Sequence, residues 1–173
     1  KGKKEIEYGL VHRIDTLTEG LLLIARNQFA YDFFIQEQNN LNFIKEYTAY
    51  CNFNSNLLLN GYPPFYKNLQ EDLLNNKKIN IKSHFRPYGK KGSSVRPVCI
   101  EKELNSFASN KKTGSTIYQT QIECCKLQNN IYKCKCKITK GFRHQVRCHL
   151  AWAGFPVIND PLYNCNPINM RDD

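Results

Sequence analysis

Two polar segments of the chain combine residue types that can carry chemistry. In the first, Asp15 follows Arg13 and precedes the apolar run 20–25 by only a few residues. A carboxylate placed there is expected to be partly buried, and burying a carboxylate is costly unless a cation or hydrogen bonds compensate it. Position alone leaves two interpretations open: a structural ion pair with an arginine such as Arg13, or a reactive carboxylate.

The second segment, residues 141–150, contains two arginines, two histidines and a glutamine at the start of a predicted helix. Cationic side chains and the N–H groups of a helix N-terminus together favour an anion such as phosphate. A solvated basic face is the simpler alternative. The segment therefore predicts either a phosphate site or an exposed basic surface.

The composition favours a globular domain with a polyanionic partner. Of 173 residues, 41% are hydrophobic, and 25 Lys and Arg against 15 Asp and Glu give a net charge of +10. Such a charge attracts nucleic acid, although a generally basic proteome or an anionic membrane surface would also explain it. No apolar run approaches the roughly 20 residues that cross a bilayer, so we expect no membrane association.

The eight cysteines admit three interpretations. A disulfide framework is disfavoured because the chain is long enough to build a core and shows no secretory signal at its start. Zinc is disfavoured because the cysteines lack C-x-x-C spacing, and Cys134 and Cys136 would face one side of a strand as packing residues. We therefore expect reduced thiols, no metal and a cytosol-like compartment.

The elements that position these segments follow from periodicity and turn residues. No repeat or linker divides the chain, so we expect one α+β domain dominated by antiparallel sheet. The run 21–25 is predicted to be a central strand buried on both faces. Further strands are predicted at 45–51, 114–125 and 131–138, and helices after Asn27, at 68–76 and at 142–154. The stretch 52–92 gives the weakest pattern.

Four motifs occur in a characteristic order. They are His12-Arg13-Ile14-Asp15-Thr16-Leu17-Thr18-Glu19-Gly20-Leu21-Leu22-Leu23, Lys45-Glu46-Tyr47, the segment 141–150 and the segment 154–163. They resemble the H-R-L-D-x-x-T-S-G-L-L-L, K-x-Y, G-R-x-H-Q-I-R-x-H-L and G-x-P-I-x-G-D-x-x-Y motifs of the RluA-type pseudouridine synthases. The resemblance covers most of the chain.

This resemblance implies a fold and an activity. The fold is a mixed, mainly antiparallel sheet with flanking helices and a central RNA-binding cleft. The activity detaches a uridine base from its ribose in structured RNA, rotates it and rejoins it through C5, without cofactor or metal. The implied partner is RNA, with ribosomal RNA favoured over transfer RNA, and the implied enzyme is a cytoplasmic monomer.

The resemblance also implies roles for individual residues. Asp15 matches the catalytic aspartate, which acts as a nucleophile or as a base at the sugar, and Arg147 matches the arginine that pairs with it. Tyr47 matches the tyrosine that stacks on the target base, which fits an enzyme that must take a base out of the stack. Further RNA contacts are predicted for His12, Arg13, Lys45, Arg143, His144 and Gln145, with Arg13 entering the RNA stack.

Several departures from the family pattern keep a second function open. Glu19 replaces the usual serine, Asn159 replaces a glycine, and the first arginine of the 141–150 motif is shifted by one position. The family's upstream motif and its last strands beyond Tyr163 are absent, so we expect residues 1–173 to form a core fragment of the catalytic domain. The alternatives are a non-catalytic RNA-binding factor that keeps the fold, and a cysteine-rich zinc protein.

Overall fold

The chain divides into two compact units. The computed structural model describes residues 8–55, 60–100 and 113–164. The first unit comprises residues 1–45 and the second comprises residues 46–173. The second unit contains most of the regular structure.

The described part of the first unit, residues 8–45, is built around one helix, α1 (Gln28–Asn39). The side chain of Asn27 caps it by accepting a hydrogen bond from the Ala30 amide at 2.9 Å, as the sequence predicts. The buried core of this unit is small and consists of Val11, Ala25 and Tyr31.

The predicted buried strand at 21–25 is wrong. Leu21 is 94% exposed, and the run pairs only through one bridge between Leu10 and Ile24 and its flanking backbone hydrogen bonds. Because one short segment is its only described strand-like neighbour, a single side of the run packs inward. An apolar run alone does not specify what covers its second face.

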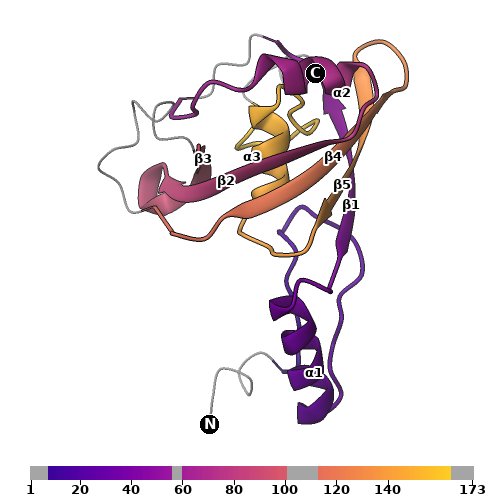
Figure 1. Cartoon of the computed structure of the whole chain (residues 1–173), viewed down its shortest axis with the longest axis vertical. Helices are drawn as coiled ribbons and strands as arrows, with labels where there is room; N and C mark the ends of the chain where they lie inside the picture. Colours follow the sequence, from indigo (N-terminus) through magenta and orange to yellow (C-terminus); the bar gives the residue numbers. More distant parts are fainter. Residues whose placement is uncertain (1–7, 56–59, 101–112, 165–173) are drawn as a thin grey trace, which may run out of the picture. The chain divides into compact units, whose positions relative to one another are not determined.

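The second unit contains a five-stranded sheet in the order β1-β5-β4-β2-β3 (Figure 1). The strands are β1 (Lys45–Asn52), β2 (Ile79–Tyr88), β3 (Ser94–Val98), β4 (Tyr118–Lys126) and β5 (Ile131–Ile138). The pairs β2–β3, β2–β4 and β4–β5 are antiparallel. Glu46 pairs with Lys137 and Asn52 donates to the Asn130 carbonyl, contacts that run antiparallel along β1 and β5. The predicted α+β class with an antiparallel sheet is thereby confirmed.

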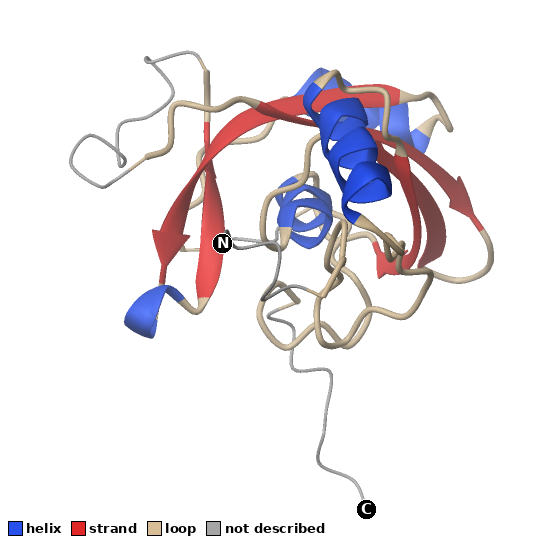
Figure 2. Cartoon of the chain, turned by 90° about the horizontal axis from the view of Figure 1, so that it is seen from below, coloured by secondary structure: helices blue, strands red, loops and turns tan. Residues whose placement is uncertain are grey.

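The sheet curls, and α3 (Gln145–Trp152) lies on its concave side (Figure 2). The helix α2 (Lys67–Leu74) packs near the end of α3, where Gln70 donates to the Ala153 carbonyl at 2.9 Å. A 3-10 turn, η2 (Lys90–Gly92), joins β2 to β3. Alternate residues of β4 and β5 face inward, and none of the described helices could span a membrane.

Candidate active site

Asp15 lies in the first unit, within a turn. Its carbonyl accepts from the Thr18 amide at 2.9 Å, and the residue is half-buried. The expectation of a partly buried carboxylate is therefore confirmed. Its catalytic role stays a prediction.

Of the two residues His12 and Arg13 near Asp15, His12 packs within the segment and Arg13 is exposed to solvent. The Nε2 atom of His12 accepts from the Leu23 amide at 3.2 Å, and its ring lies 5.9 Å from that of Phe43. Burial lowers the pKa of His12, as does the nearby charge of Lys45. Arg13 is exposed, as a residue that enters an RNA stack must be. The Arg13 side chain is thus open to solvent, whereas His12 packs within its segment. The RNA contacts predicted for both residues stay predictions.

Lys45 and Tyr47 lie at the beginning of β1. The ammonium group of Lys45 is 5.7 Å from the centre of the Phe43 ring, and burial lowers the pKa of this lysine. Tyr47 is half-buried and packs against the main hydrophobic core of the second unit. A ring held on one side by a core has restricted motion, which suits a stacking platform.

The segment 141–150 begins its helix later than the sequence predicts. His144 has a left-handed backbone (φ 56°), and α3 starts at Gln145 instead of Phe142. A left-handed residue cannot continue a right-handed helix, so Arg143 precedes the helix. The Arg143 guanidinium, on an exposed residue, donates to the carbonyls of Gly92 and Ser94 and holds the β2–β3 hairpin.

Gln145 is buried and connects α3 to the sheet. Its amide nitrogen donates to Thr120 Oγ1 at 3.0 Å and to the Gln119 carbonyl at 2.9 Å, while its oxygen accepts from the Phe142 amide at 2.9 Å. His149 lies one turn further along α3 and contacts the same Thr120 hydroxyl at 2.8 Å. This geometry supports a positioning role for Gln145, and its predicted RNA contact stays a prediction.

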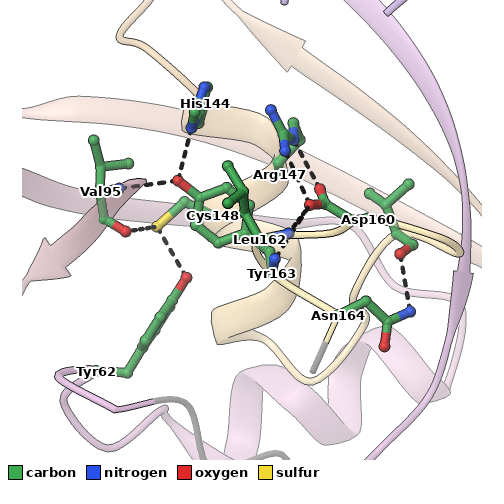
Figure 3. Close-up of polar contacts among 10 residues, drawn as sticks. Tyr62, Val95, His144, Arg147, Cys148, Asp160, Leu162, Tyr163 and Asn164 are labelled. Atoms are coloured by element: carbon green, nitrogen blue, oxygen red, sulfur yellow. Dashed lines mark hydrogen bonds and ion pairs between the residues drawn. The ribbon is translucent and has the colours of Figure 1, made fainter. Parts of the chain in front are cut away.

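Arg147 projects from α3 and forms a bidentate ion pair with Asp160 (Figure 3). Its Nε lies 2.7 Å from Asp160 Oδ2, and its Nη2 lies 2.9 Å from Oδ1. The side chains are 16% and 3% exposed, so water screens the pair weakly. The pair fixes the plane of the guanidinium group.

Asp160 is a site residue to which the sequence assigns no role. Besides Arg147, it accepts from the amides of Leu162 at 2.9 Å and Tyr163 at 3.1 Å. Burial opposes ionisation, but these hydrogen bonds and the arginine outweigh it and lower the pKa of Asp160. The aspartate and tyrosine of the 154–163 motif are the signal that identifies it, because their spacing closes this loop around one carboxylate.

Tyr163 links the Arg147 pair to the β2–β3 hairpin. Its hydroxyl accepts from the Val95 amide at 3.0 Å and contacts His144 Nδ1 at 2.9 Å (Figure 3). The ring centre lies 5.1 Å from the Arg147 guanidinium and 5.9 Å from that of Arg96. His144 is thereby connected to the loop that carries Asp160 and Tyr163, and it remains half-buried.

Two further arginines lie opposite each other on the β2–β3 hairpin. Arg86 and Arg96 are register partners and are 3% and 6% exposed. Arg96 stacks on Tyr62 and Tyr88, and burial and the charge of Arg96 lower the pKa of Arg86. The sequence did not single out these arginines, because the hairpin itself lies mostly in the stretch with the weakest pattern.

The described residues give no arrangement of metal ligands. Within 8–55, 60–100 and 113–164, no group of three or more histidine, cysteine or acidic side chains could hold a metal ion. The chemistry that the described geometry offers is that of oriented carboxylates and guanidinium groups beside aromatic rings.

Comparisons with known proteins identify one family. Residues 1–152 match the family model for RNA pseudouridylate synthase. RNA pseudouridine synthase 7 of Arabidopsis thaliana is 28% identical over 153 residues, which are 88% of this chain and 33% of that protein. Ribosomal large subunit pseudouridine synthase D of Borreliella burgdorferi is 25% identical over 162 residues, which are 93% and 40% of the two chains.

A solved structure shares the fold. Human RNA Pseudouridylate Synthase Domain Containing 1 has a TM-score of 0.59 at 19% identity, over 93% of this chain and 59% of that one. The chain spans 33% and 40% of the lengths of the two curated relatives above. Because the family model matches most of its residues, the chain belongs to the RNA pseudouridylate synthase family.

Proposed function

We propose that this chain carries the catalytic core of an RNA pseudouridine synthase that isomerises uridine in structured RNA. The observation that carries the proposal is that the family match runs through Asp15, Tyr47 and Arg147, all of which are retained. A fold kept only for RNA binding would be free to lose these three side chains. Their retention favours catalysis over the alternative of a non-catalytic RNA-binding factor.

In this proposal Asp15 acts as an ionised carboxylate, as a nucleophile or as a base at the sugar. On the family resemblance, Arg147 is its proposed ion-pair partner. The ion pair with Asp160 uses two of the five N–H groups of the guanidinium. Asp160 then has the role of a positioning residue that fixes the plane of the Arg147 guanidinium.

The RNA is proposed to bind through base stacking and charge. Tyr47 provides an aromatic face, and exposed Arg13 provides a cationic wedge for the place of the displaced base. The net charge of +10 supplies attraction to the phosphate backbone, and therefore a binding constant that falls with salt.

Ribosomal RNA is the proposed substrate class, ahead of transfer RNA. One relative is a ribosomal large subunit pseudouridine synthase by name, which supports this choice for that protein and suggests it here. On the resemblance alone, we also propose a cytoplasmic monomer that needs no metal or cofactor.

The decisive experiment uses cellular RNA that carries tritium at uridine C5. The wild-type protein is expected to release the label, because C5 loses its hydrogen when the base is rejoined there. Asp15→Ala should abolish release while leaving RNA affinity nearly unchanged. Glu19→Ala is the matched control, since it removes an exposed carboxylate four positions away and should keep turnover.

Two results would contradict the proposal. Salt-dependent RNA binding by the wild type, without label release from any cellular RNA, would favour the non-catalytic factor. A loss of RNA binding by Asp15→Ala equal to its loss of activity would remove the catalytic role of Asp15.

A further inference from the structure

Three buried cysteines of the second unit form one row across neighbouring strands. Cys51 lies on β1, Cys134 on β5 and Cys124 on β4, and these strands are adjacent in the sheet. All three residues are 0% exposed. We call this set the thiol row. The row belongs to the main hydrophobic core of the second unit, against which Tyr47 also packs.

Cys124 and Cys134 are direct register partners on β4 and β5. The amide of Leu127 donates to the carbonyl of Ile131, which makes that pair hydrogen-bonded. Along an antiparallel ladder, hydrogen-bonded pairs alternate with pairs that are not hydrogen-bonded. Cys124 and Cys134 lie three residues from Leu127 and Ile131, so they form a pair that is not hydrogen-bonded. The side chains of such a pair are closer together than those of a hydrogen-bonded pair. Their sulfur atoms lie 2.6 Å apart.

Other cysteines of the same two strands lack this arrangement. Cys136 is on the same strand and face as Cys134 and is equally buried, but its register partner is Ile122. Cys125 follows Cys124, is exposed and lies opposite Lys133. The close thiol pair is therefore specific to one register position, and the hairpin contains its own matched controls.

Cys134 lies between Cys51 and Cys124, because β5 lies between β1 and β4 in the sheet. Hydrogen bonds from Cys124 and Cys51 lower the pKa of Cys134, whereas the hydrogen bond with Cys134 and then burial raise the pKa of Cys51 and Cys124. A thiolate is the form that attacks an oxidant, and a second thiol beside it can resolve the product.

We propose that Cys124 and Cys134 are an oxidative modification site that closes to a cross-strand disulfide with hydrogen peroxide. The Cys134 thiolate attacks one peroxide oxygen and releases hydroxide, which takes up a proton to become water and leaves a sulfenic acid. The Cys124 sulfur then attacks Cys134 Sγ and displaces the second water. Two thiols lose two electrons and two protons, and one peroxide becomes two water molecules. The disulfide locks the β4–β5 hairpin.

The test needs a protein in which peptide mapping is unambiguous. Trypsin releases residues 113–126, which contain both Cys124 and Cys125, and it releases 134–135 and 136–137 as identical Cys-Lys dipeptides. The variant Cys125→Ala/Cys136→Ala removes both ambiguities and keeps the proposed pair. Its circular dichroism should match that of the wild-type chain.

This variant is treated with hydrogen peroxide under native conditions, alkylated in denaturant and digested without reductant. We expect peptide 113–126 linked to the dipeptide 134–135, and we expect the link to disappear after treatment with dithiothreitol. The melting temperature of the oxidised protein should exceed that of the reduced protein, because the cross-link restricts the unfolded hairpin. Adding Cys124→Ser should remove both effects.

Three results would overturn the proposal. One is a link between 134–135 and the peptide 46–67, which contains Cys51. Another is recovery of Cys124 and Cys134 as alkylated thiols after peroxide treatment that converts exposed Cys125 of the wild type to its oxidised acids. The third concerns the test variant with Cys134→Ser added. It is a yield of disulfide-linked peptide 113–126 equal to that of the test variant itself.

Discussion

The two units of the chain hold the candidate catalytic residues on hydrophobic cores of very different size. Asp15 lies in a unit whose core consists of Val11, Ala25 and Tyr31, whereas Arg147 projects from a helix packed into a curled sheet with an extended core. The first unit also exposes large apolar side chains, including Leu21 at 94% and Phe29 at 84%. Substitutions of buried residues in the second unit should therefore lower stability, whereas substitutions of exposed residues in the first unit should have little effect on stability.

The ion pairs of the second unit provide the largest expected contrast. Asp160→Ala should lower the free energy of unfolding by about 3–5 kcal/mol, because it leaves the guanidinium of Arg147 partly buried without its carboxylate. Asp72→Ala removes an exposed pair with Lys77 of similar length, 2.8 Å, and should cost less than about 1 kcal/mol. Urea unfolding of both variants measures the difference. Equal losses would mean that burial does not set the strength of the Arg147 pair.

Core packing should give the next largest contrast. Leu150→Ala empties a site that is 0% exposed and should destabilise the protein by about 2–5 kcal/mol. Leu21→Ala in the first unit should change the free energy of unfolding by less than about 0.5 kcal/mol. The same urea experiment compares them. A large loss for Leu21→Ala would show that this side chain is buried in the folded protein.

Acid should weaken the second unit through His149. Burial lowers the pKa of His149 to about 3 from 6.5, so the folded ring stays neutral while the unfolded chain takes up a proton below pH 6.5. Stability is thus complete above pH 6.5 and should fall by about 1.4 kcal/mol per pH unit below it, or about 2 kcal/mol by pH 5. His149→Gln should flatten this slope, whatever its effect at neutral pH.

His12 is the matched comparison in the first unit. Its pKa is also lowered, first by burial, but the residue is only half-buried, so solvent screens the effect. His12→Gln should leave the slope of stability against pH almost unchanged between pH 6.5 and 5. If His12→Gln flattened the slope as much as His149→Gln does, the loss of stability in acid could not be assigned to His149.

The smallest expected effect concerns the charge near Asp15. Glu19→Ser restores the family's usual residue and removes an exposed negative charge, so RNA affinity should rise about two- to five-fold at low salt. The gain should shrink as salt is added. Glu71→Ser, which removes an exposed charge from α2, is the control, and filter binding across a salt series measures both. An equal gain for Glu71→Ser would mean that only net charge matters.

Local sequence patterns predicted the elements that carry their own signals. The β5 strand has the predicted ends 131–138, and its lysines and cysteines separate onto two faces. The first helix begins at its asparagine cap. Each of these signals depends on residues within one element, so no knowledge of distant partners was needed.

The remaining errors depend on contacts that are distant in sequence. In β2, Ile79, Ile81, Ser83 and Phe85 alternate inward, but a serine and the surrounding lysines conceal the pattern. Ser83 is buried there because it contacts His149, 66 residues further along the chain. The role of Asp160 likewise depends on Arg147, which no local period reveals. Asp15, Tyr47 and Arg147 were predicted from family motifs, and not from periodicity.

The buried histidine of α3 has a consequence for the direction of its hydrogen bonds. His149 Nε2 lies 2.9 Å from Ser83 Oγ, and Nδ1 lies 2.8 Å from Thr120 Oγ1. A neutral imidazole has one donor and one acceptor, so one hydroxyl must donate to the ring and the other must accept from it. A single tautomer therefore orders the protons from β2 through α3 to β4. Replacing either hydroxyl would leave one ring nitrogen without its counterpart and loosen the helix that carries Arg147.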